Sequence, residues 1–115
     1  MSERSLSLLL QDILDAIASI RSYTNNISLE QYLVDSKTKH AVERNFSIIG
    51  EAVSRIDNEL KEQFPNINWR QVKDFRNIII HDYFGIDDTI VWDIIHFDLQ
   101  QLKEDIEEVK KKIST

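Results

Sequence analysis

The stretch LSLLLQDILDAIASI, residues 6–20, decides the fold class of this chain. Its leucines and isoleucines recur at spacings of three and four residues, and this spacing places them on one face of a helix. They are Leu6, Leu9, Leu10, Ile13, Ile17 and Ile20. The pattern predicts a helix over roughly residues 3–24, ended by Asn25 and Asn26.

The same spacing continues beyond this helix, between clear breaks. Ser28 followed three residues later by Gln31 is typical of a capping box and predicts a short helix, SLEQYLVD. A long helix is then predicted from about Ser36 to Leu60, and the proline-containing segment QFPNIN follows it as the clearest break in the chain. Gly50 stands within this helix, where glycine costs about 1 kcal/mol relative to alanine, so we expect another helix to cross close to it.

Two further helices are predicted after the proline. Asn68 followed by Gln71 repeats the capping-box pattern and begins a helix at Trp69, which we expect to end near Gly85. Its apolar stripe is Val72, Phe75 and Ile79. Asp87 or Asp88 then caps a last helix. That helix carries the apolar residues Val91, Ile95, Leu99, Leu102, Ile106, Val109 and Ile113, and from Ile95 onward their steps of four and three form a heptad-like seam.

Composition narrows the fold and the class of protein. Two Gly and one Pro in 115 residues are too few turn residues for a many-stranded β fold, so we expect a single domain over residues 1–115, an all-α up-and-down bundle of four to five helices. The chain has no Cys, which excludes disulfides and fits a cytoplasmic location. Its apolar runs are shorter than the roughly 18 residues of a membrane span. A net charge of −6 argues against a broad nucleic-acid surface and leaves room only for a local basic patch.

The stretch RNIIIHDYF, residues 76–84, gathers polar side chains around three isoleucines. At about 100° per residue, Lys73, Asn77 and His81 share one stripe of the predicted helix, while Arg76 and Tyr83 share a second. Arg76 and His81 would then lie about 140° apart. They could act on one substrate only if the helix end distorts or if a second subunit completes the site.

These residue types suit phosphodiester cleavage without a metal. His81 titrates near neutral pH and can carry the protons of the reaction, and Arg76 offers a permanent forked charge to the phosphate. Asn77 could orient His81, and Tyr83 could stack on a base or present its hydroxyl for modification. A histidine beside an apolar run can equally be a packed or surface residue, and Arg76 can pair with a nearby carboxylate, so the spacing alone leaves their role open.

The pattern R-N-x-x-x-H-x-Y, formed by Arg76, Asn77, His81 and Tyr83, resembles the signature of HEPN domains, specifically the HepT-like toxin family. Two further segments resemble other blocks of that family: AVERNFSIIGEAVSRI, which contains Gly50, and NINWRQVKDFRN, which leads into the motif. The resemblance covers most of the chain in the expected order.

The resemblance implies a helical homodimer with metal-independent endoribonuclease activity, in which two motifs face each other across a cleft. Arg76 and His81 would be catalytic, with Asn77 supporting them. It also implies a partner, a minimal nucleotidyltransferase antitoxin that attaches AMP to Tyr83 and silences the toxin. No cofactor and no metal are expected. Lys73 and Arg70 are candidates for contacts to RNA phosphates because they share the helix of the motif.

Two other functions remain open at this point. The domain could be a non-catalytic partner of a nucleotidyltransferase or could hold a nucleotide, but loss of the arginine or the histidine would be the mark of such a module, and both are present. It could also be a helical HD-type metal phosphohydrolase, since carboxylate and imidazole ligands suit such metals. The ligands would be His40, His81, Asp82 and either Asp93 or Asp98. That reading leaves Arg76 and Asn77 unexplained.

Overall fold

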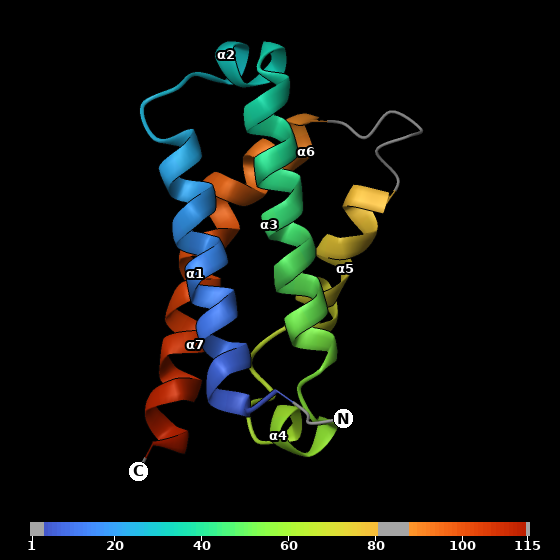
Figure 1. The fold of residues 1–115 in the computed structure, drawn as a ribbon. Helices are drawn as coiled ribbons and strands as arrows, with labels where there is room; N and C mark the ends of the chain where they lie inside the picture. Colours follow the sequence, from blue (N-terminus) through green and yellow to red (C-terminus); the bar gives the residue numbers. More distant parts are fainter. Residues whose placement is uncertain (1–3, 81–87, 115) are drawn as a thin grey trace.

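The computed structural model describes residues 4–80 and 88–114, and these residues form helices and no strand. The bounds are α1 (Leu6–Thr24), α2 (Leu29–Val34), α3 (Ser36–Ser54), α4 (Asn58–Glu62), α5 (Trp69–Ile80), α6 (Asp88–Asp93), a π-helical turn η2 (Ile94–Asp98) and α7 (Leu99–Ile113). In Figure 1, α3 stands between α1 and α5, and α7 packs along α1. The four long helices form the bundle, which confirms the all-α prediction.

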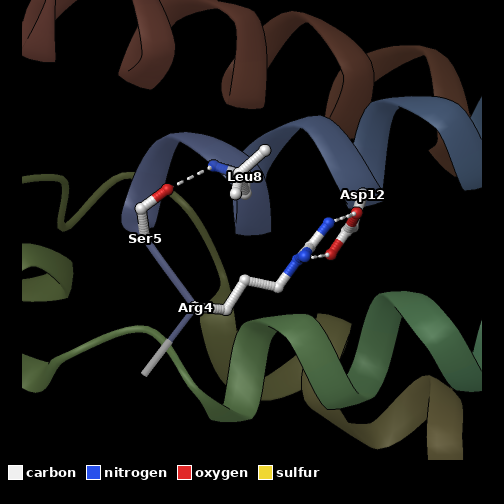
Figure 2. A network of polar contacts seen from close by, with 4 residues as sticks. All are labelled: Arg4, Ser5, Leu8 and Asp12. Atoms are coloured by element: carbon white, nitrogen blue, oxygen red, sulfur yellow. Dashed lines mark hydrogen bonds and ion pairs between the residues drawn. The ribbon is translucent and has the colours of Figure 1, made fainter. Parts of the chain in front are cut away.

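The N-terminal end of α1 is fixed by its own side chains (Figure 2). The Leu8 N–H donates to the hydroxyl of Ser5 at 3.3 Å, which caps the helix. The Arg4 guanidinium donates to both carboxylate oxygens of Asp12, at 2.6 and 2.9 Å. These hydrogen bonds raise the pKa of Arg4. The segment before α1 is therefore tied to the second turn of the helix.

The predicted capping box of α2 is confirmed. The Gln31 N–H donates to the Ser28 hydroxyl at 3.1 Å, and the Ser28 N–H donates to the Gln31 side chain at 2.8 Å. The next helix, α3, is capped by Asp35, whose carboxylate accepts hydrogen bonds from the hydroxyl and the N–H of Thr38 at 2.7 and 3.0 Å. These bonds hold the pKa of Asp35 below its usual value.

The predicted long helix from Ser36 to Leu60 is wrong at its C-terminal end. The structure ends α3 at Ser54, and α4 begins only at Asn58. The Arg55 N–H bonds to the carbonyl of Ala52, and the Ser54 hydroxyl bonds to a carbonyl of its own last turn at 2.7 Å, so the helix tightens and stops. The turn places Ile56 in the core, with an exposed fraction of 3%.

The predicted last helix is also interrupted, by η2. Val91, Ile95 and Leu99 are all buried although they are four residues apart. In a regular α-helix two such steps would rotate the third side chain by about 80° away from the first. In η2 the Leu99 N–H instead bonds to the carbonyl of Ile94, five residues back, and this wider turn keeps all three side chains in the core. From Ile95 to Val109 the predicted seam is buried as expected.

Trp92 of α6 is partly buried beside α2. Its ring centroid lies 5.2 Å from that of Tyr32 and 4.3 Å from that of His96. The His96 Nδ1 lies 2.8 Å from the Trp92 carbonyl oxygen. Across the described helices, none combines the length and apolar content needed to cross a bilayer.

Candidate functional site

The helix of the motif, α5, is held at its start by polar contacts. The Gln71 N–H donates to the side-chain oxygen of Asn68 at 3.0 Å, which is the first half of the predicted capping box. The indole N–H of Trp69 donates to the carbonyl oxygens of Lys61 and Phe64, at 3.2 and 3.1 Å. Because these carbonyls belong to α4 and the segment after it, α4 is fixed against the first turn of α5.

The described side chains of α5 include apolar residues in the core and cationic residues at the surface. Val72 and Phe75 are buried, and the ring of Phe75 packs edge-on against Phe46 of α3 with 5.4 Å between ring centroids. The cationic side chains are Arg70, Lys73 and Arg76, and all three are exposed. They are three residues apart, so each lies about 60° around the helix from the next. Their charges therefore follow one side of α5, and the exposed Asp74 lies about 40° around the helix from Arg70, at the edge of that side.

Gly50 brings α3 and α5 into close contact beside the motif, which confirms the predicted helix crossing. A Cβ atom at position 50 would lie 2.7 Å from the Cβ of Arg76, 3.2 Å from its backbone nitrogen and 3.2 Å from the carbonyl oxygen of Lys73. Only a residue without a side chain fits at this point. The backbone of α5 at Lys73 and Arg76 therefore lies directly against α3.

The structure places some of the predicted site residues and not others. Arg76 is an exposed residue of α5, and the backbone of Asn77 continues the same helix. His81 and Tyr83 lie outside the described residues, as does Gly85, the expected helix end. The two predicted stripes and the separation of Arg76 from His81 therefore stay predictions.

Lys61 is a basic residue of this region that the sequence did not single out. Partial burial and the nearby charge of Lys73 lower the pKa of Lys61. Within residues 4–80 and 88–114, none of the ion pairs involves Lys61, Arg70, Lys73 or Arg76. We call these four residues the basic face. No sequence signal points to Lys61. Its helix, α4, packs against α5 only because the chain turns between α3 and α4, and that turn was not predicted.

A pocket of about 160 Å³ opens on another side of α5, toward η2 and α7. Its polar lining consists of the side chains Asn66, Asn68, Gln71, Gln101, Asp98 and Asp105. Apolar residues of α5 and α7, such as Phe75, also line it. No residue of the basic face contributes to it, and its two carboxylates would repel a phosphate. The pocket is therefore distinct from the basic face.

The start of α6, the first described element after the motif, is attached to α3 by an ion pair. The ammonium of Lys39 lies 2.9 Å from a carboxylate oxygen of Asp88, and both side chains are mostly buried. This contact lies at the N-terminal end of α3, whereas Gly50 contacts α5 near its C-terminal end. One helix therefore holds the chain both before and after residues 81–87.

The HD-type metal set has three of its candidate residues in the described part of the chain. His40 lies on α3, Asp93 ends α6 and Asp98 ends η2. Among residues 4–80 and 88–114, no three His, Asp or Glu side chains are grouped as a metal ion would require. His81 and Asp82 lie outside those residues, so the set as a whole is not placed.

Comparison with known proteins assigns the chain to a family. A family model described as "Ribonuclease HepT-like" matches residues 13–109. A predicted RNase of Methanocaldococcus jannaschii is 37% identical over 107 residues, which cover 93% of this chain and 98% of the relative. A predicted ribonuclease HepT of Thermococcus cleftensis is 39% identical over 109 residues, 95% of this chain and 99% of the relative. No solved structure matches. The chain belongs to the HepT-like ribonuclease family.

Proposed function

We propose that this protein is a metal-independent endoribonuclease and the toxin component of a toxin–antitoxin pair. The observation that carries the proposal is the basic face, which ends at exposed Arg76, the first residue of the motif. In a chain with a net charge of −6, four cations outside any described ion pair form the kind of local patch that an RNA backbone requires. Membership of a ribonuclease family supports the same activity.

The proposed reaction uses the 2′-hydroxyl of the RNA as the nucleophile. Its oxygen attacks the adjacent phosphorus while the bond from phosphorus to the 5′-oxygen breaks, which leaves a 2′,3′-cyclic phosphate and a 5′-hydroxyl. His81 would take the proton from the 2′-hydroxyl, and Arg76 would neutralise the charge that builds on the phosphate. Asn77 would orient His81. The leaving 5′-oxygen needs a proton from a second carrier, which a second motif could supply.

We further propose that the protein acts as a homodimer. Ile90 and Phe97, on α6 and η2, have exposed fractions of 52% and 76%. Asp98, the next residue after Phe97, lines a pocket together with Phe75 of α5, so this end of η2 lies close to the helix of the motif. Ile90 and Phe97 are the apolar side chains that we propose for the dimer contact. A two-fold axis there would bring two motifs together and supply the second proton carrier.

The nuclease proposal is tested with purified protein and RNA in EDTA. Cleavage should persist in EDTA and should be lost in His81→Ala and in Arg76→Ala, while far-UV circular dichroism shows an unchanged helix content. Lys111→Ala, which removes an exposed charge on α7, is the matched control and should cleave like the wild type. Full activity of His81→Ala would contradict the proposal. Loss of cleavage in EDTA would instead favour the HD-type metal enzyme.

The dimer proposal is tested by light scattering at micromolar concentration. The wild type should have the mass of a dimer, and Phe97→Ser should have the mass of a monomer. Val34→Ser is the control, because Val34 has an exposed fraction of 84% but lies on α2. A monomeric wild type, or a Phe97→Ser variant that stays dimeric, contradicts this interface.

We propose that a minimal nucleotidyltransferase antitoxin silences the protein by transferring AMP to the hydroxyl of Tyr83. The modification would add a bulky anion that competes with RNA for Arg76. After incubation with the cognate partner and ATP, mass spectrometry should find AMP-sized increments on the wild type and none on Tyr83→Phe. Equal labelling of Tyr83→Phe would place the modification elsewhere. Labelling without any ribonuclease activity would support a non-catalytic module instead.

A further inference from the structure

We propose that Gly50 is a positioning residue for Arg76, because its missing side chain sets how closely the motif helix lies against α3. The inference rests on the proposed ribonuclease function and deepens it. Gly50 does not touch the substrate in this account. It acts through Arg76 and, by way of the backbone, through Lys73.

The atoms that meet Gly50 are fixed parts of α5. A Cβ at position 50 would lie 2.7 Å from the Cβ of Arg76, a separation that real Cβ atoms essentially never show. The next two neighbours, the Arg76 nitrogen and the Lys73 carbonyl oxygen, are both backbone atoms at 3.2 Å. No rotation of a side chain relieves these contacts, because they involve the root of Arg76 and the helix backbone. Room for a methyl group can come only from movement of α5 away from α3.

Other contacts of α5 resist that movement. Phe75, the neighbour of Arg76, is buried and packs against Phe46 one turn before Gly50 on α3. Trp69 ties the start of α5 to the carbonyls of Lys61 and Phe64. A methyl group at position 50 would therefore tilt α5 locally, at Arg76, because the helix is held elsewhere. The exposed guanidinium of Arg76 would move with its Cα.

The expected effect on stability has an unusual sign. Alanine in place of glycine within a helix normally stabilises a protein, because alanine has the higher helix propensity. At position 50 the overpacking should outweigh that gain, and we expect Gly50→Ala to lower the melting temperature by roughly 5–10 °C. Glu51→Ala, at the exposed position next to Gly50 in the same helix and outside the described ion pairs, is the control and should leave the melting temperature nearly unchanged.

Packing and positioning are separated by two double-mutant cycles. In the first, Gly50→Ala is combined with Arg76→Gly, which removes the Cβ at 2.7 Å. The loss of melting temperature caused by Gly50→Ala should then shrink to less than half. An undiminished loss, or a rise in melting temperature for Gly50→Ala alone, would overturn the inference.

The second cycle measures RNA cleavage well below the melting temperature of every variant. Gly50→Ala should lower kcat by about tenfold, since displacement of a charged group by less than 1 Å removes stabilisation of the transition state, while KM changes little. In an Arg76→Lys background, where the forked contact is already lost, Gly50→Ala should change kcat by less than about twofold. A purely structural glycine would instead lower kcat by the same factor in both backgrounds, and that result would overturn the inference.

These results also distinguish the inference from the proposal beneath it. If the wild type cleaves RNA and Arg76→Ala does not, the proposed function stands. A Gly50→Ala variant that then cleaves like the wild type overturns the positioning role alone. If the wild type does not cleave RNA, the proposed function fails and the positioning role fails with it.

Discussion

Partial burial lowers the pKa of Lys61, and the nearby charge of Lys73 lowers it further. This arrangement opposes folding at neutral pH, because a charged group is partly buried and two like charges repel. Acidic residues are abundant in this chain, 20 Asp and Glu against 14 Lys and Arg, yet no described carboxylate forms an ion pair with either lysine. The phosphate contacts that we propose would give the pair a use that stability does not explain.

Lys73→Gln should therefore change stability and RNA binding in opposite directions. We expect the free energy of unfolding to rise by about 0.2–0.5 kcal/mol, since exposed like-charge pairs are screened by water, and RNA affinity to fall. The pKa of Lys61 should rise toward its ordinary value of 10.5. Because the repulsion needs a charged Lys61, the stability gain should be present at neutral pH and fade as pH rises through the pKa of Lys61. Denaturant unfolding at pH 7 and pH 11 measures this, and a gain equal at both pH values would contradict it.

The helix starts that have a short sequence motif were predicted from the sequence, whereas the turn after α3 and the π turn η2, which have no such motif, were not. The capping boxes at Ser28 and Asn68 are patterns of four residues, so the starts of α2 and α5 were predictable. The turn after Ser54 contains neither Gly nor Pro, and it forms because Ile56 reaches the core. The π turn has one trace in the sequence. Val91, Ile95 and Leu99 are separated by two consecutive steps of four residues, which a regular α-helix would not keep on one face.

In the candidate site, too, some features could be predicted from the sequence of a single helix and others could not. The place of Arg76 on a helix follows from the apolar spacing of that helix, and the close contact at Gly50 follows from the presence of a glycine inside a helix. The approach of Lys61 depends on how two helices pack after an unpredicted turn, and no pattern within either helix encodes it.

Deletion of Phe97 from η2 should leave the bundle folded. Without this residue Ile95 and Leu99 are three residues apart, and a regular α-helix then places Val91 and Leu99 within about 20° of each other. Compared with the monomeric Phe97→Ser variant, we expect the melting temperature to be unchanged or higher, because the π turn is removed and the buried seam is kept. Deletion of Glu104 from α7 is the control. It turns the seam after Leu102 by about 100° and should lower the melting temperature strongly. An equal loss of melting temperature in the two deletion variants would contradict the prediction that the bundle tolerates removal of the extra residue in η2.

For the whole molecule, α3 is the central element of the bundle. It packs against α1 on one side and α5 on the other (Figure 1). Its buried residues Phe46, Ile49 and Val53 join the two sides into one hydrophobic core. Disruption of the contact between α3 and α5 should therefore destabilise the entire fold and not only the motif helix.

Phe46→Ala tests this dependence. The side chain has an exposed fraction of 3% and contacts Phe75 across the interface, so its removal should lower the free energy of unfolding by about 3–5 kcal/mol. That is a large part of the roughly 5–15 kcal/mol available to a domain. Phe97→Ala, at an exposed fraction of 76%, should change it by less than about 0.5 kcal/mol in the monomer. Urea unfolding of both variants gives the comparison, and a cost below about 1 kcal/mol for Phe46→Ala would contradict a shared core.

The ion pair between Lys39 and Asp88 and the contact between Gly50 and Arg76 together constrain the length of α3. The two positions on α3 are eleven residues apart, close to three full turns, so they share one side of the helix and lie about 16 Å apart along it. A single inserted residue between them would turn one attachment point about 100° away from its partner. Insertions there should abolish activity, whereas an insertion after Asp57, an exposed residue of the turn, leaves α3 and the buried Ile56 in place and should be tolerated. In a scan of single-residue insertions along the gene, the boundary between these outcomes should fall in the turn after α3.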